Sequence, residues 1–272
     1  MAAVRLHVTG LLMPSHQWQA DMNTDDARLA PPGLAALCVA SLAALVGCGG
    51  NACIGLDGCS GANVAPSVAL SGTAATGKAL ASATVGFTCA QGSGSVLSDG
   101  GGHYNVTFNA TLPCILAVTA GGTTLHSLAF AGGTFNTTPE TELMLVYLAS
   151  QLGTTESGLI AGFPGNSRFQ QALANQTDVL DAQSAVVANL QSRYSVTLTA
   201  PAFLTTPFIV GQAGVDSDLG VLSTAGAIDA NGMPDPAAVS LMSAAGAAHP
   251  LASTSAPSSG TGGTSGATGG TM

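Results

Sequence analysis

Three histidines beyond residue 50 carry the side chains best suited to chemistry near neutral pH, because an imidazole can bind a metal or transfer a proton. His103 follows a Gly-rich turn, His126 lies in a strand-like segment, and His249 precedes a Ser/Thr-rich tail. No two of them have the spacing of zinc ligands, and no Gly-x-Ser-x-Gly motif occurs. The sequence therefore predicts no catalytic residues, no cofactor, no metal ligands and a protein that is not an enzyme.

Two other patterns come close to ligand-binding motifs. The segment Gly72–Ala79 nearly matches the phosphate-binding pattern Gly-x4-Gly-Lys-Ser/Thr, but Ala79 lacks the hydroxyl that binds Mg²⁺. The segments Asp216–Asp218 and Asp229–Asn231 are similar to parts of calcium loops, but their glycines fall at the wrong positions. We interpret the first as a loop between strands, with no nucleotide partner, and the others as turns or helix caps.

An uncharged apolar run of 13 residues spans 34–46. It is shorter than the roughly 20 residues of a membrane-spanning helix and fits the apolar region of an export signal. The last two residues of the run begin the sequence Leu45-Val46-Gly47-Cys48, which resembles the lipobox of bacterial lipoproteins. The resemblance implies that residues 1–47 are a signal peptide and that Cys48 is acylated, with palmitate as one of the acyl groups. It also implies that residues 48–63 form a Gly-rich tether.

The signal region departs from the usual pattern in one respect. Before the apolar run it holds three aspartates and only two arginines, whereas a signal normally begins with a basic segment. A start at Met22 would leave 26 residues up to Gly47, which is a normal length. By the lipoprotein resemblance, Gly49 after the acylated cysteine implies the outer membrane, with the protein on its periplasmic or cell-surface face.

The remaining cysteines fit an exported protein, since disulfides form in oxidising compartments. Cys38 lies within the signal, and Cys53, Cys59, Cys89 and Cys114 remain after processing. Of three connectivities we favour Cys53–Cys59, which closes a small Gly-rich loop, and Cys89–Cys114, which joins two expected strands. A zinc site is the alternative, and the spacings Cys-x5-Cys and Cys-x24-Cys do not favour it.

Residues 64–138 have the alternating pattern of a β-sandwich. Apolar side chains recur at every second position in 83–89 and in 104–108, and a Gly-rich turn signal at 98–103 predicts a hairpin between those strands. Further strands are expected at about 114–119 and 123–130. The sequence predicts an α+β protein in which this small antiparallel β-sandwich precedes a helical region.

The same stretch resembles the carboxypeptidase regulatory-like domains, small sandwiches of the transthyretin or prealbumin type. The residues that carry the resemblance are Val68–Thr73, Gly77–Val85 and the hairpin Ser98–Tyr104. It covers under a third of the chain. The resemblance implies a structural or interaction module without catalytic residues.

Helical signals occupy residues 139–248. Thr138 can cap a helix that begins at Pro139. Apolar residues at three-, four- and seven-residue intervals predict one long helix over about 166–193, and shorter helices are expected near 215–228 and 236–247. Residues 249–272 are almost entirely Ser, Thr, Gly, Ala and Pro, and we expect them to be disordered.

The amino-acid composition restricts the classes of function that the chain can have. Only 7% of residues are charged and the formal net charge is −9, which excludes a nucleic-acid binder as the first interpretation. We expect an outer-membrane-anchored lipoprotein whose partners are the membrane and an unidentified envelope protein, acting as a binding or structural module. The alternatives are an envelope hydrolase or accessory domain with a site in 139–248, and an adhesin-like or export-system component.

Overall fold

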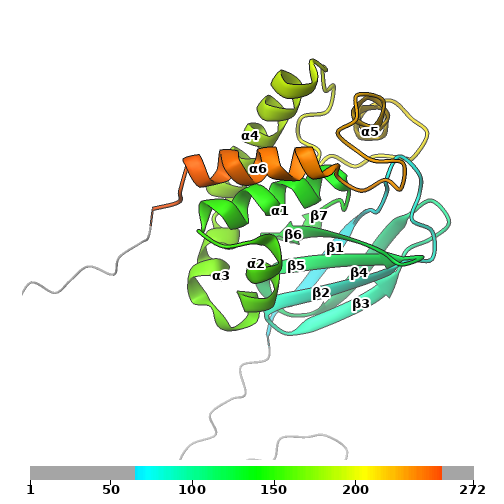
Figure 1. Cartoon of the computed structure of the whole chain (residues 1–272). Coiled ribbons are helices and arrows are strands. Elements are labelled where there is room, and N and C mark those ends of the chain that lie inside the picture. Colours follow the sequence, from blue (N-terminus) through cyan, green and yellow to red (C-terminus); the bar gives the residue numbers. More distant parts are fainter. Residues whose placement is uncertain (1–64, 253–272) are drawn as a thin grey trace, which may run out of the picture. The chain divides into compact units, whose positions relative to one another are not determined.

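The computed structural model describes residues 65–252 (Figure 1). In this part of the chain seven strands precede six α-helices, which confirms the α+β class. The strands are β1 (Ser67–Thr73), β2 (Thr84–Gln91), β3 (Ser93–Leu97), β4 (His103–Asn109), β5 (Thr111–Ala120), β6 (Thr123–Ala129) and β7 (Gly133–Thr134).

The strands form two sheets that face each other. One has the order β3-β2-β5-β6 and is antiparallel throughout, and the other has the order β4-β1-β7. The second sheet is mixed, because β7 runs parallel to β1. Phe87 of β2 joins the two layers: its ring centroid lies 6.0 Å from that of Tyr104 and 5.4 Å from that of Phe108, both on β4.

The predicted hairpin at 98–103 is a turn, but it joins the two sheets and not two paired strands. It follows β3, which pairs with β2, and it precedes β4, which pairs with β1. The sequence pattern does not predict β3, because this short strand contains Ser and Gly and has no fully buried residue to mark a period. The turn therefore sends the chain from one layer of the sandwich to the other.

The inner face of β2 is made by the alternating residues that the sequence identified. Ala83 just before the strand, and Val85, Phe87 and Cys89 within it, are all buried. Cys89 stands opposite Cys114 of β5 in the strand register, and the two form the expected disulfide. Cys53 and Cys59, the other expected pair, lie outside the described residues.

Six α-helices follow the sandwich. They are α1 (Pro139–Gln151), α2 (Glu156–Gly162), α3 (Ser167–Ala174), α4 (Gln176–Tyr194), α5 (Val215–Thr224) and α6 (Pro236–Ala248), with a short 3-10 helix at Phe163–Gly165. Thr138 caps α1 through a reciprocal pair of hydrogen bonds with Thr141, as the Thr-Pro signal predicts.

The single long helix expected over 166–193 is wrong. Residue Asn175 has an extended backbone conformation and separates α3 from α4. Its side chain accepts a hydrogen bond from the backbone N–H of Thr177 and thereby caps α4. Asn175 therefore ends one helix and caps the next. The spacing of apolar residues continues across it, so that spacing alone does not predict the break.

Helix α1 is the centre of the helical layer. The sequence suggested one inner stripe, yet nearly every residue of α1 is buried, because β6 packs on one side of it and α6 on the other (Figure 1). The α6 contact depends on Gly246, where a Cβ atom would overlap the backbone carbonyl of Tyr147. Buried side chains of the sandwich and of the helices form one continuous core.

The helices cover the outer face of the four-stranded sheet. Strand alternation places His126 and Leu128 of β6 on that face, with Ile115 of β5 beside Leu128. Leu128 and Ile115 are buried although they point away from the sandwich interior. The structure therefore has three layers: the mixed sheet, the antiparallel sheet and the helices.

Candidate functional site

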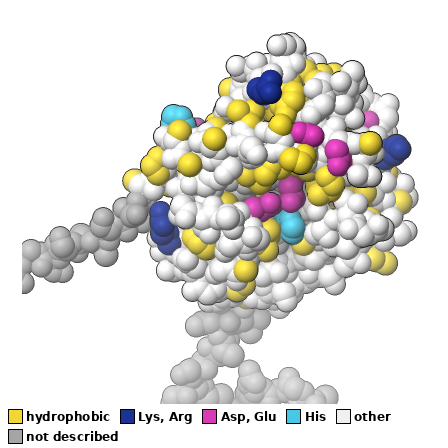
Figure 2. Space-filling model, viewed as in Figure 1, with side chains coloured by type: hydrophobic (Ala, Val, Ile, Leu, Met, Phe, Trp, Pro, Cys, Tyr) yellow, Lys and Arg dark blue, Asp and Glu magenta, His cyan; other side chains and the backbone are white. Residues whose placement is uncertain are grey.

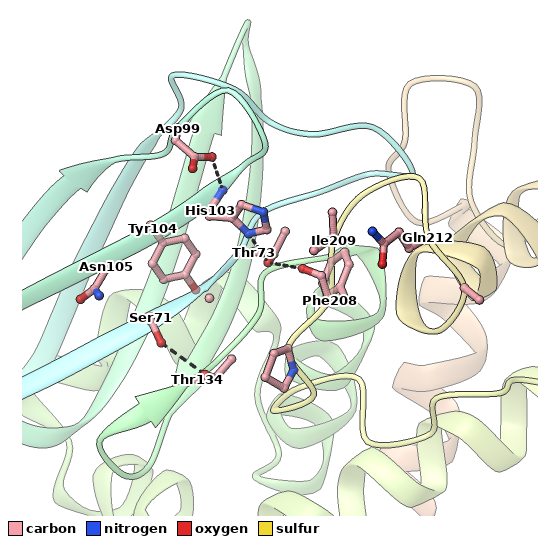
Figure 3. Close-up of a pocket in the computed structure, with 13 residues that line it drawn as sticks. Ser71, Thr73, Asp99, His103, Tyr104, Asn105, Thr134, Phe208, Ile209 and Gln212 are labelled. Carbon is pink, nitrogen blue, oxygen red and sulfur yellow. Dashed lines mark hydrogen bonds between the residues drawn. The ribbon is translucent and has the colours of Figure 1, made fainter.

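A pocket lies where the end of β1 meets the segment 207–213 (Figure 3). Its volume is about 770 Å³. Residues of β1, β4 and the preceding turn form the floor, and the loop between α4 and α5 forms the wall. The lining residues are Ser71, Gly72, Thr73, Asp99, His103, Tyr104, Asn105, Thr134, Pro207, Phe208, Ile209, Gln212 and Ala213.

The floor is polar because of strand register. Antiparallel pairing of β1 with β4 places Ser71 opposite Asn105 and Thr73 opposite His103. These residues alternate with the buried Leu70 of β1, so their side chains project from the outer face of the mixed sheet. The result is a row of hydroxyl, amide and imidazole groups beside the loop.

Thr73 links the floor to the wall. Its hydroxyl donates to the carbonyl oxygen of Phe208 at 3.0 Å, and it lies 2.9 Å from Nδ1 of His103 (Figure 3). A hydroxyl has one proton, so the bond to Phe208 requires that Nδ1–H of His103 be the donor to Thr73. In the neutral imidazole, this arrangement fixes the tautomer and leaves Nε2 of His103 as the acceptor.

A buried asparagine holds the loop in place from behind. The amide nitrogen of Asn136 donates to the carbonyl oxygens of Phe203 at 2.8 Å and Thr206 at 2.7 Å, while its amide oxygen accepts the backbone N–H of Thr73 at 3.1 Å. The residue is fully buried. Asn136 therefore joins the strand that forms the floor to the start of the loop that forms the wall.

Two further polar groups of the pocket, the Asp99 carboxylate and the Tyr104 hydroxyl, form hydrogen bonds with backbone groups. The Asp99 carboxylate accepts the backbone N–H groups of His103 and Gly101, both at 2.8 Å. These bonds, that from His103 most of all, hold the pKa of Asp99 below its ordinary value. The Tyr104 hydroxyl donates to the carbonyl of Phe135, and burial raises its pKa.

The pocket's chemistry suits an uncharged polar ligand. Among the residues that line it, none is Lys or Arg, and the exposed carboxylate of Asp99 disfavours an anion. Asn105 and Gln212 are exposed and offer amide donors and acceptors, while Ile209 adds an apolar contact. Such a surface can form several neutral hydrogen bonds around a small apolar patch.

A second cluster, on the other side of the antiparallel sheet, brings together one imidazole and two carboxylates. Nδ1 of His126 on β6 lies 3.2 Å from Oε1 of Glu142 on α1 and 3.7 Å from Oε1 of Glu156 on α2. Burial, and then the neighbouring Glu142 carboxylate, raise the pKa of Glu156. These are the residues of the described chain with the chemistry and proximity to hold a metal ion.

The three histidines that the sequence identified as candidates lie in three different parts of the structure. His103 lies in the pocket, His126 in the second cluster and His249 at the end of α6. Cys48, the expected lipidation site, lies outside the described residues. The segment Gly72–Ala79 leads from β1 toward strand β2, not into a helix, in agreement with its interpretation as a loop between strands.

The two calcium-like segments are turns and helix starts, as interpreted. Asp218 in the first turn of α5 is buried and accepts the backbone N–H groups of Thr199 and Ala200. Asp229 accepts the N–H groups of Asn231 and Met233 and closes a tight turn. Asp229 thus has donors within its own turn, and Asp218 has donors from the segment 199–200.

Comparison of the chain with known protein families, with curated proteins and with solved structures finds no match in any of the three. Within residues 65–252, no helix has the length and apolar character needed to cross a bilayer. The two sites therefore have to be interpreted from their own geometry.

Sequence reasoning identified neither site as a unit. No motif in the sequence marks Glu142 or Glu156 as a candidate ligand. The three residues of the cluster come from a strand and two helices with separations of 16 and 14 residues, which matches no local ligand motif. The pocket loop 207–213 matches no local binding motif, and its Pro207 is a general signal of a loop.

Proposed function

We propose that the chain is a lipid-anchored module of the bacterial envelope, held at the outer membrane through Cys48, that binds an uncharged polar ligand in the pocket of β1, β4 and the loop 207–213. The anchor is supported by the apolar run and the sequence Leu45-Val46-Gly47-Cys48. Attachment through more than one acyl chain would be stable, whereas a single chain binds only marginally.

The observation that supports the pocket's role is its place on β1. In the sequence, Cys48 precedes the Ser67 end of this strand, and the pocket lies at the Thr73 end. At about 3.3 Å per residue the two ends are about 20 Å apart. A ligand in the pocket would thus be bound at the end of the strand opposite the anchored end.

A role in binding, without bond breaking, agrees with what the polar groups of the pocket do. The Thr73 and Tyr104 hydroxyls donate to backbone carbonyls, and the Asp99 carboxylate accepts two backbone N–H groups. These groups shape the pocket. The exposed amides of Asn105 and Gln212 remain as the contacts through which a ligand would be recognised.

The pocket is tested by titrating the purified chain with uncharged oligosaccharides and, separately, with short uncharged peptides, while amide resonances are followed by NMR. We expect one of the two classes to shift Ser71, Asn105 and Gln212. The double variant Asn105→Ala/Gln212→Ala should weaken that binding by about tenfold or more, because two hydrogen bonds are worth about 1 kcal/mol each.

Gln91→Ala with Asn231→Ala is the matched control, since both residues are exposed amides outside the pocket. Binding by the control should equal that of the parent chain. If neither class of probe shifts the pocket resonances, or if the control weakens binding as much as the pocket variant, the proposed ligand site is wrong.

The hydrolase alternative gains one observation. Glu142 and Glu156 both lie in 139–248, the region to which that alternative assigned a site, and they meet His126 of β6, which lies outside that region. The adhesin-like and export-system alternatives stay predictions, and recovery of a specific envelope protein with the exported chain would favour them.

A further inference from the structure

Three elements from two layers of the fold, the antiparallel sheet and the helices, meet at the cluster of His126, Glu142 and Glu156. His126 projects from the outer face of β6, Glu142 stands one turn into α1, and Glu156 begins α2. One ligand atom from each residue lies within 4.8 Å of the other two. Figure 2 shows acidic side chains beside a histidine on the viewed face, in the region of α1 and β6.

The spacing of these atoms is that of metal ligands. Zinc bonds of about 2.0–2.2 Å at tetrahedral angles separate neighbouring ligand atoms by roughly 3.3–3.6 Å. Nδ1 of His126 lies 3.2 Å from Oε1 of Glu142 and 3.7 Å from Oε1 of Glu156. The ligand atoms of Glu142 and Glu156 lie within 4.8 Å of each other, so side-chain adjustment would place a cation within bonding distance of all three residues.

The charges of the cluster also favour a cation. Two carboxylates share it, and in the described chain their ion pairs are with His126, not with a lysine or arginine. Oε1 of Glu156 is buried and has no hydrogen-bond partner among these residues. A buried carboxylate oxygen without a partner is costly, and a metal ion would satisfy it.

Neighbouring groups of the fold support each of the three candidate ligands. The second carboxylate oxygen of Glu142 accepts the backbone N–H of His126, and the Thr141 hydroxyl donates to the carbonyl of His126 at 2.8 Å. Thr155 caps α2 and so fixes the position of Glu156. Supporting contacts of this kind orient the ligands of metal sites.

We propose that His126, Glu142 and Glu156 bind one divalent cation of the zinc class and leave a further coordination position open to water. The choice of cation follows from the donors, since one imidazole with two carboxylates suits zinc and its neighbours. The open position follows from exposure: the side chains of His126 and Glu156 are 20% and 22% exposed, which admits solvent on one side. This site does not depend on the ligand pocket proposed above.

Calorimetric titration of the chelator-treated full chain with ZnCl₂ tests the proposal. We expect saturation at one equivalent. Co²⁺ should give the visible absorption of a four- or five-coordinate ion, without the charge-transfer band of a thiolate, which distinguishes this cluster from the cysteines. His126→Ala and Glu156→Gln should each weaken zinc binding by more than about 100-fold, because even supporting residues of metal sites are worth about 10- to 100-fold.

His249→Ala and Asp181→Asn are the matched controls, being an exposed imidazole and an exposed carboxylate elsewhere. They should bind zinc as the parent chain does. If His126→Ala fails to fold, as judged by circular dichroism, the partly exposed Glu156→Gln decides. Absence of saturable binding at one equivalent, or unchanged affinity in folded Glu156→Gln, would overturn the proposal and leave the cluster as a hydrogen-bonded structural contact.

Discussion

Glu140 and Asp218 are neighbouring buried carboxyl groups that differ in their hydrogen bonds. Asp218 accepts three groups from the segment 199–200: the backbone N–H groups of both residues and the Thr199 hydroxyl. Both oxygens of Glu140 are buried without a hydrogen-bond partner in the described residues. Burial, and then the negative charge of Asp218, raise the pKa of Glu140 well above its ordinary value of 4.5. The folded protein therefore keeps Glu140 protonated at a pH where the unfolded chain ionises it.

This difference gives Glu140 a stability effect of defined sign. Since the pKa in the folded state is the higher one, the contribution is fully present below about pH 4.5 and is lost as the pH rises toward the folded-state pKa. The slope is at most about 1.4 kcal/mol per pH unit for one group. Glu140→Gln should remove it, so the variant should gain stability over the parent between pH 5 and pH 8, as measured by urea denaturation. Asp181→Asn, an exposed carboxylate, is the control, and an equal difference at every pH would contradict the assignment.

At the scale of elements, the pairing of β2 with β5 carries the one disulfide of the described chain. Cys89 and Cys114 are 25 residues apart, and closing a loop of that length removes unfolded-state entropy worth about 3.5 kcal/mol. Cys89→Ala/Cys114→Ala should lower the free energy of unfolding by roughly that amount, as measured by denaturation against the oxidised parent. A thiol count confirms oxidation of the parent. An unchanged stability would show that β2 and β5 need no covalent link.

The contact of α1 with α6 offers a second test on elements. Gly246→Ala should destabilise the protein by about 1–3 kcal/mol, because the added methyl group would overlap the Tyr147 carbonyl and push the helices apart. Gly220→Ala in α5 is the matched control, since nothing lies within 4 Å of its Cβ position. That change should raise stability by up to about 1 kcal/mol through helix propensity. Thermal denaturation distinguishes the two, and a stabilising Gly246→Ala would contradict the close packing.

The elements that the sequence predicted are those whose signals are local. Alternation identified β2, β4, β5 and β6, and the Thr138-Pro139 cap identified the start of α1. The two-residue β7 and the short α2 are formed by tertiary contacts and carry little periodic signal. The burial of α1 on all sides could not be foreseen, because it depends on α6, almost a hundred residues later in the chain.

At the scale of the whole molecule, the sites were beyond prediction for the same reason. The pocket requires β1 to meet the loop 207–213, and Asn136 makes that connection through contacts about 65 residues or more along the chain. Only 14 residues of the chain are Asp or Glu, yet Glu142 of α1 and Glu156 of α2 converge on His126. A small number of acidic residues in the sequence therefore does not exclude a site at which two of them lie together.

The central claim is that the folded module is tied to a membrane by acylated Cys48, and the mass of the exported protein tests it most directly. The chain is produced with labelled palmitate in a bacterium that processes lipoproteins, extracted from the outer membrane and measured intact. We predict a chain that begins at Cys48 and carries label and acyl mass, and a Cys48→Ala variant that carries neither. A soluble exported chain, or an unprocessed chain that keeps the residues before Cys48, would contradict the account.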